Sequence, residues 1–255
     1  MEEKRTRQPR HGIRLWAVVF WLALWQVAAM CIKQEILLVS PVLAVGRLAQ
    51  LALTPGFWGS IGFSLLRIAS GFLLGLGFGV GLAVCSALWV RVRELLAPFM
   101  QTAKSIPVAS FIILCLVWIS SRNLSVFIAF LMVLPVIYTN TLEGIGNMDK
   151  GLQDMARVFG VPAARRVAYI YTSQVMPYIK SGCKISLGIC WKAGIAAEVI
   201  GIPSGSIGEK LYQSKIFLDM PDLFAWTIVI VTISVLFEKL VLRLMEWGVY
   251  AMEHR

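Results

Sequence analysis

Near its middle the chain reads Asp154-Met155-Ala156-Arg157-Val158-Phe159-Gly160, and Met176-Pro177 follows at the start of the next hydrophobic run. The heptapeptide belongs to a polar, basic, helix-forming loop from about residue 143 to about residue 180, set between hydrophobic runs. In a membrane protein, an amphipathic loop of this kind indicates a surface on which a soluble partner docks. We therefore predict that a soluble partner binds to this loop and thereby moves the membrane part.

The hydrophobic residues, 58% of a chain of 255, are grouped in long runs, whereas a soluble domain would need a largely polar surface. Four uncharged runs have the length of a helix that crosses a hydrocarbon core of ~30 Å: residues 15–32, 68–90, 105–121 and 123–142. Two more follow, about Ser181 to Ile200, and Leu223–Phe237 with an amphipathic end. The sequence thus predicts an all-α, polytopic membrane protein with about six transmembrane helices.

The net charge of +10 reflects membrane orientation, because the 24 lysines and arginines are unevenly distributed. If the N-terminus is cytoplasmic, sixteen of them lie in cytoplasmic segments and five in outer segments. This bias follows the positive-inside rule and predicts that both termini are cytoplasmic. Residues 1–14 are then a cytoplasmic N-terminal tail and residues 15–255 the transmembrane domain. The same bias argues against nucleic-acid binding.

Two further features indicate no separate function. The apolar run of residues 15–32 is too long for the core of a signal peptide, and no A-x-A-like cleavage site follows it, so we interpret it as the first transmembrane helix. The five cysteines lie in or beside apolar runs without C-x-x-C pairing. We interpret them as small buried hydrophobic residues and expect no metal or disulfide site.

The second span carries Gly71, Gly75 and Gly79 at intervals of four residues, and Ala83 continues the row. Small residues at this spacing allow helices to approach closely in a membrane. The glycine-rich string has no preceding strand, so we predict helix packing and not a nucleotide-binding fingerprint. Arg67 precedes Gly71 by one turn and is expected to face protein, water or the membrane interface.

Prolines and glycines predict the breaks between elements. Pro107, near the start of the third span, and Pro135, within the fourth, can kink their helices. The outer segment Lys33–Gly59 is predicted to be irregular or partly helical. The segment Ile202–Pro221 is predicted to cover the outer mouth or to meet an external partner.

Within the polar loop, Asn147-Met148-Asp149-Lys150 is typical of a turn and a helix cap. The next helix is predicted to run to about Phe159, with Gly160 as a left-handed C-cap. Pro162 suits the first turn of another short helix. The predicted order is helix, glycine turn, helix, on the cytoplasmic side.

The loop resembles that of inner-membrane permease subunits of binding-protein-dependent ABC importers, most closely the nitrate/sulfonate/taurine type. The family pattern is E-A-A-x3-G-x9-I-x-L-P. Here Asp154-Met155-Ala156 stands at E-A-A, Gly160 and Ile170 keep the spacing, and Thr172-Ser173 replaces L-P, with Met176-Pro177 just beyond. Four other stretches also resemble the family, which extends the similarity from about Gly59 to the C-terminus: SLLRIASGFLLGLGFGVGLAV, LAPFMQTAKSIPVASFIILCLVWIS, LPVIYTNTLEGIGNMD and WKAGIAAEVIG.

The resemblance implies the type I (MetI-like) permease fold, with cytoplasmic coupling helices, in a non-catalytic transport subunit of the bacterial inner membrane. It implies as partners a second permease chain, identical or different, two ATPase subunits and an extracytoplasmic substrate-binding protein. The chain has no G-x-x-x-x-G-K-[ST] phosphate loop, so ATP and Mg²⁺ would bind to the ATPase and no cofactor to this chain. The implied substrate is a small anion such as nitrate, sulfonate or taurine, or alternatively a thiamine precursor or another small organic solute.

The resemblance also implies a set of ATPase-coupling residues: Asp154, Ala156, Arg157, Val158, Phe159, Gly160 and Pro162. Val158 and Phe159 would fill an apolar socket on the ATPase. Asp154 and Arg157 would set the register through charge pairs at its rim. A solvated amphipathic helix is the alternative explanation of the same residues.

Charged residues within the spans are candidates for the translocation pathway. Lys184, Gly188 and Lys192 recur at i, i+4 and i+8 and so share roughly one side of a helix, where Lys192 could lower the barrier to an anion. Glu198 points elsewhere, as a gate or as a structural hydrogen-bond acceptor near the outer end. Arg67 completes the set as a substrate contact or a structural residue.

Two rival functions remain open from the sequence. An ion-coupled secondary transporter would use Arg67, Lys192 and Glu198, but the two halves show no clear internal repeat. A membrane enzyme would need a nucleophile beside a base or a set of metal ligands, and no such constellation appears. Recovery of an ATPase with the chain would favour the importer.

Overall fold

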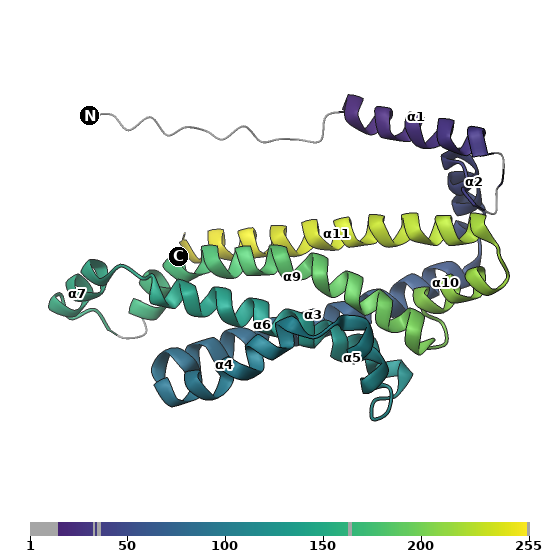
Figure 1. Ribbon diagram of the computed structural model, residues 1–255. Coiled ribbons are helices and arrows are strands. Elements are labelled where there is room, and N and C mark those ends of the chain that lie inside the picture. Colours follow the sequence, from purple (N-terminus) through teal and green to yellow (C-terminus); the bar gives the residue numbers. More distant parts are fainter. Residues whose placement is uncertain (1–14, 33, 35–36, 163–164, 254–255) are drawn as a thin grey trace.

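The computed structural model describes residues 15–32, 34, 37–162 and 165–253, and every regular element in this part of the chain is a helix. Figure 1 shows a body of long helices, which comprises α3 (Pro55–Leu88), α6 (Ser121–Gly146), α9 (Thr172–Gly201) and α11 (Met220–Glu253). The all-α prediction is therefore confirmed. The predicted tail of residues 1–14 lies outside the described residues.

The shorter helices lie at the two ends of the body. Helices α2 (Pro41–Ala52), α5 (Val108–Cys115) and α10 (Ile207–Ile216) lie toward one end, whereas α7 (Lys150–Val158) projects from the other, near the C-terminal end of α11 (Figure 1). Helix α1 (Leu15–Ile32) stands apart along most of its length. It is held at one end by Trp25, whose indole N–H donates to the Val39 carbonyl (3.0 Å).

Small residues on α3 explain how closely this helix packs against α6, as predicted from their spacing. A Cβ atom on Gly71 would lie 2.7 Å from the Cβ of Ala129, and one on Gly75 would lie 2.6 Å from the Cβ of Val133. Neither distance is possible for real side chains, so glycine is required at both positions. The core continues toward α9 through large side chains that are almost fully buried: Ile68, Phe72 and Trp191.

The predicted third span, residues 105–121, is wrong as a single helix. Helix α4 (Val90–Ser105) ends at Ser105, and α5 follows after a bend of 106°. Pro107 causes the break, because it has no N–H to donate and it disfavours helical geometry at Ile106, which adopts φ −70° and ψ 129°. Pro135 lies inside α6 without ending that helix.

Helix α3 begins at Pro55 and not at residue 68, because the charge of Arg67 does not end it. Helix α11 continues past Phe237 to Glu253, in agreement with the predicted amphipathic end of this run. Part of Lys33–Gly59 is helical, as predicted, since it contains α2, and Ile202–Pro221 contains α10.

In the described part of the chain, α3 and α6 are long and apolar enough to cross a membrane, and the bent pair α4 and α5 forms either one broken span, which would be a third crossing, or a re-entrant loop. Helices α9 and α11 have 30 and 34 residues. Helix α9 carries Lys184, Lys192 and Glu198, whose charges lower its mean hydropathy. These helices fit a polytopic membrane protein, as predicted, while the number of six crossings stays a prediction.

Candidate functional site

The predicted N-cap of the polar loop is present and holds α7 against the body. Asp149 Oδ1 accepts hydrogen bonds from the backbone N–H groups of Gly151 (2.7 Å) and Leu152 (3.4 Å). The backbone N–H of Asp149 donates to Gln174 Oε1 on α9 (2.7 Å). One residue therefore both starts α7 and connects it to a long helix of the body.

Gly160 ends α7 in the left-handed conformation, as predicted, with φ +65°. Its N–H donates to the Arg157 carbonyl (3.1 Å), and the N–H of Val161 donates to the Ala156 carbonyl (2.9 Å). No atom of the described residues lies within 4 Å of a Cβ built on Gly160, so among these residues only backbone strain would oppose a side chain there.

Helix α7 presents apolar side chains to the outside. Val158 and Phe159 are 83% and 77% exposed, and Met155 is 50% exposed, while Ala156 is buried on the side of the body. We call Met155, Val158 and Phe159 the α7 patch. Clustered apolar side chains with this exposure indicate a surface that contacts protein or membrane.

Asp154 and Arg157, predicted to pair with a partner, face each other across 3.5 Å in the isolated chain. Both side chains are about 70% exposed. A surface ion pair of this kind contributes little to stability, roughly 0–1 kcal/mol. Either side chain can therefore leave this ion pair and form one with a charged group of a partner protein at a small cost in free energy.

Pro162 lies where a helical turn begins, since its carbonyl accepts the N–H of Arg166 (3.0 Å). Residues 163 and 164 lie outside the described residues. A wide helical turn, η1 (Arg166–Tyr171), then runs directly into α9, and Thr172 Oγ1 donates five residues back to the Val167 carbonyl (2.8 Å). The predicted start of this span at about Ser181 is therefore wrong, because the helix that follows the loop is continuous with it.

Lys184 and Lys192 lie on one side of α9, as predicted, and both are exposed in the single chain. Gly188 lies between them and is half-buried, and Ile185 and Ile189 are exposed on the same side. We call Lys184, Ile185, Ile189 and Lys192 the lysine face. An ammonium group at membrane depth requires water or a protein partner, so this face indicates an aqueous space or a second chain.

Arg67 is partly buried on α3, where its guanidinium carbon lies 4.4 Å from the centre of the Phe63 ring. Its Nη1 is buried and forms no hydrogen bond to any described residue. The cation–π contact with Phe63 offsets part of the free-energy cost of burying Nη1 without a hydrogen bond. Arg67 thus faces protein, which is one of the three environments expected for it.

Glu198 is fully buried inside the protomer and does not share the lysine face. Ser64 Oγ on α3 donates to Glu198 Oε2 (2.6 Å), and the backbone N–H of Gly208 donates to the same oxygen (3.4 Å). Of the two roles that the sequence leaves open for Glu198, this geometry supports the structural hydrogen-bond acceptor.

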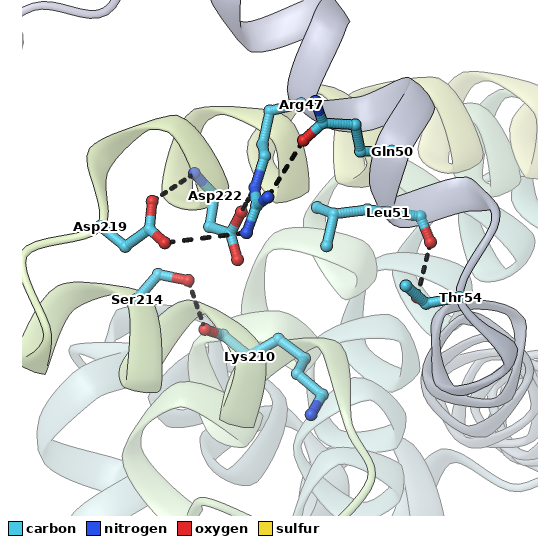
Figure 2. A network of polar contacts seen from close by, with 8 residues as sticks. All are labelled: Arg47, Gln50, Leu51, Thr54, Lys210, Ser214, Asp219 and Asp222. Atoms are coloured by element: carbon cyan, nitrogen blue, oxygen red, sulfur yellow. Dashed lines mark hydrogen bonds and ion pairs between the residues drawn. The ribbon is translucent and has the colours of Figure 1, made fainter.

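Sequence reasoning missed the ion pairs that connect α2 with the start of α11 (Figure 2). Arg47 Nε donates to Asp222 Oδ1, and Arg47 Nη2 lies 3.9 Å from Asp219 Oδ2. The hydrogen bond to Asp222 raises the pKa of the Arg47 guanidinium above its ordinary value. Gln50 accepts a further bond from Arg47 Nη1 (3.1 Å). No local sequence pattern signals this contact, because Arg47 and Asp222 are 175 residues apart.

Comparison with known proteins covers most of the chain. Residues 71–248 match the family model described as "Binding-protein-dependent transport system inner membrane component". The chain is 29% identical over 238 residues to a putative aliphatic sulfonates transport permease protein of Bacillus subtilis (strain 168), which covers 92% of this chain and 84% of that protein. It is 25% identical over 192 residues to the bicarbonate transport system permease protein of Synechococcus elongatus, with 75% and 69% covered.

A solved structure, the crystal structure of an amino acid ABC transporter with histidines, has the same fold. Its TM-score is 0.59 at 16% identity, and the alignment covers 79% of this chain and 96% of that one. The matched residues 71–248 include the second half of α3 and the whole loop with Asp149, the α7 patch and Gly160. The chain therefore belongs to the inner-membrane components of binding-protein-dependent transport systems, the permease subunits of ABC importers.

Proposed function

We propose that this permease subunit imports a small anion across the bacterial plasma membrane, and that α7 is the surface on which ATPase subunits dock. The α7 patch is the observation that carries the docking proposal, because Val158 and Phe159 are large, apolar and exposed at the tip of a capped helix. The sulfonate and bicarbonate named for two relatives are both anions, which supports the substrate class.

Docking would remove the α7 patch from water, and the apolar area buried would supply most of the affinity. Asp154 and Arg157 lie at the edge of the patch, where charge pairs with the ATPase would set the register. Ala156 and the bond between Asp149 and Gln174 connect α7 to η1 and α9, so a displacement of α7 would be passed to the body. ATP and Mg²⁺ would be held by the ATPase.

The lysine face would line the pathway together with a second permease chain. Lys184 and Lys192 place two positive charges along α9, which attract an anion while the neighbouring isoleucines contact protein or lipid. The α7 end would be cytoplasmic, with both termini on that side. The end with α2 and α10 would face the substrate-binding protein. Pro162 and Gly160 would set the direction in which α7 leaves the body.

ATP-dependent uptake into proteoliposomes tests the function directly. The permease is reconstituted with its ATPase, and radiolabelled sulfonate, nitrate or bicarbonate is supplied with the binding protein. We expect uptake only with ATP, at least tenfold lower in Lys192→Gln and near normal in the control Lys215→Gln, which changes an exposed lysine in the last turn of α10. Uptake that needs an ion gradient and no ATPase would contradict the proposal and support the secondary transporter.

A further inference from the structure

Two buried side chains connect three helices at the outer end of the body. Ser64 on α3 and Glu198 on α9 are both fully buried. Ser64 Oγ donates to Glu198 Oε2 (2.6 Å) and accepts the backbone N–H of Ile207 at the start of α10 (2.9 Å). The N–H of Gly208 donates to the same carboxyl oxygen (3.4 Å). Helices α3, α9 and α10 therefore meet at one oxygen atom.

Ser125 brings α6 to the same carboxyl group. Its side chain is fully buried beside the Glu198 carboxyl group. Within the described part of the chain, neither Ser125 Oγ nor Glu198 Oε1 has a hydrogen-bond partner. Buried polar atoms in proteins are nearly always paired, so these two groups can pair with each other, with water or with the Arg67 guanidinium, whose buried Nη1 also has no partner among the described residues.

The backbone of α10 lies directly on Glu198. A Cβ atom on Gly208 would lie 2.3 Å from the Cβ of Glu198, which no other residue type could accommodate. Ile202 ends α9 in the left-handed region with φ +48°, and Ser206 caps α10 by accepting the N–H of Glu209 (2.9 Å). A carboxylate at the first turn of a helix is stabilised by the N–H groups that have no partner within the helix.

We infer that Glu198 is a positioning residue that holds the hairpin of α9 and α10 on α3 and α6, so that their outer ends move as one rigid unit. Without the carboxyl group, the N–H group of Gly208 and the hydroxyl of Ser64 would lose their shared acceptor in an apolar surrounding, and Ser64, which accepts the N–H of Ile207, would lose the bond that orients its hydroxyl. The hairpin would then separate from α3. The link to transport rests on the proposed function, whereas the contact itself can be measured in the isolated chain.

Amide hydrogen exchange of the full chain in nanodiscs tests the contact. In Glu198→Ala we expect exchange at least tenfold faster in residues 203–216 and 60–66, with residues 71–83 and 150–160 unchanged. Glu198→Gln should show a smaller change, because its amide oxygen still accepts. The matched control is Glu209→Gln, which removes a carboxylate that accepts only within the hairpin, from Gly205 (2.6 Å) and Gln213 (3.4 Å). Unchanged exchange in Glu198→Ala, or equal acceleration along the whole chain, would overturn the inference.

A transport assay distinguishes a positioning role of Glu198 from an effect on protein stability alone. In the reconstituted importer we expect Glu198→Ala to keep basal ATP hydrolysis while transport per ATP falls several-fold, Glu198→Gln to lose less, and Glu209→Gln to match the wild type. A Glu198→Ala variant that is folded and couples normally would overturn the positioning role. If the wild type binds no ATPase, the proposed function fails, and the exchange experiment still decides whether Glu198 holds the hairpin.

Discussion

Gly75 on α3 and Val133 on α6 approach so closely that a Cβ on the glycine would lie 2.6 Å from the valine Cβ. Gly77, two residues further along the same helix, makes no such contact, because no atom of the described residues lies within 4 Å of a Cβ built on it. The contact at Gly75 therefore comes from the spacing of the small residues and not from the glycine content of α3.

This difference predicts opposite effects of the same substitution at the two positions. Gly75→Ala should destabilise the protein by about 1–3 kcal/mol, since overpacking forces α3 and α6 apart. Gly77→Ala should be neutral or stabilising by up to about 1 kcal/mol, because alanine is the better helix former. Thermal unfolding in detergent, followed by tryptophan fluorescence, measures both. Equal effects of the two substitutions would contradict the close packing.

The ion pair between Arg47 and Asp222 should connect the outer segments measurably but weakly. Their side chains are 38% and 19% exposed, so solvent screens part of the attraction. A double-mutant cycle with Arg47→Gln and Asp222→Asn should give a coupling free energy of about 1 kcal/mol. The coupling should shrink in 1 M salt, where charges interact over only about 3 Å. A coupling that is independent of salt would show that packing, and not charge, joins α2 to α11.

The N-cap at Asp149 should control the order of α7. Asp149→Ala removes the acceptor of two backbone N–H groups and should destabilise the helix by about 1 kcal/mol, whereas Asp149→Asn should retain most of the cap. We therefore expect affinity for the ATPase to fall about fivefold in the alanine variant, as biolayer interferometry would measure. Equal losses in both variants would assign the effect to the charge of Asp149 and not to capping.

The local features of the polar loop and of α3 were predictable from the sequence because each depends on neighbouring residues. Asp149 at the cap, Gly160 at positive φ and the row of Gly71, Gly75 and Gly79 follow from short-range geometry and spacing. The hydrophobic runs likewise predicted an all-α membrane protein. Their boundaries were less accurate, because Arg67 lies inside α3, and α5 ends at Cys115 although the uncharged run continues to residue 121.

The contacts between distant segments were not predictable in the same way. Glu198 binds Ser64, which is 134 residues away, and Arg47 binds Asp222 across 175 residues. A polar residue in a span indicates a special role, but only the packing of helices decides whether it faces a pathway or a buried serine. The same limit applies to Lys192, whose exposed position on α9 becomes interpretable once the buried side of that helix is known.

Binding of the ATPase to α7 is the central claim, and a matched pair of phenylalanines tests it most directly. Phe159 ends α7 and is 77% exposed, and Phe217 ends α10, which lies at the opposite end of the body (Figure 1), and is 79% exposed. The purified ATPase should bind the wild type and Phe217→Ser with equal affinity in detergent, and Phe159→Ser at least tenfold more weakly. Equal binding of the ATPase to all three proteins would contradict the assignment of α7 as the docking surface.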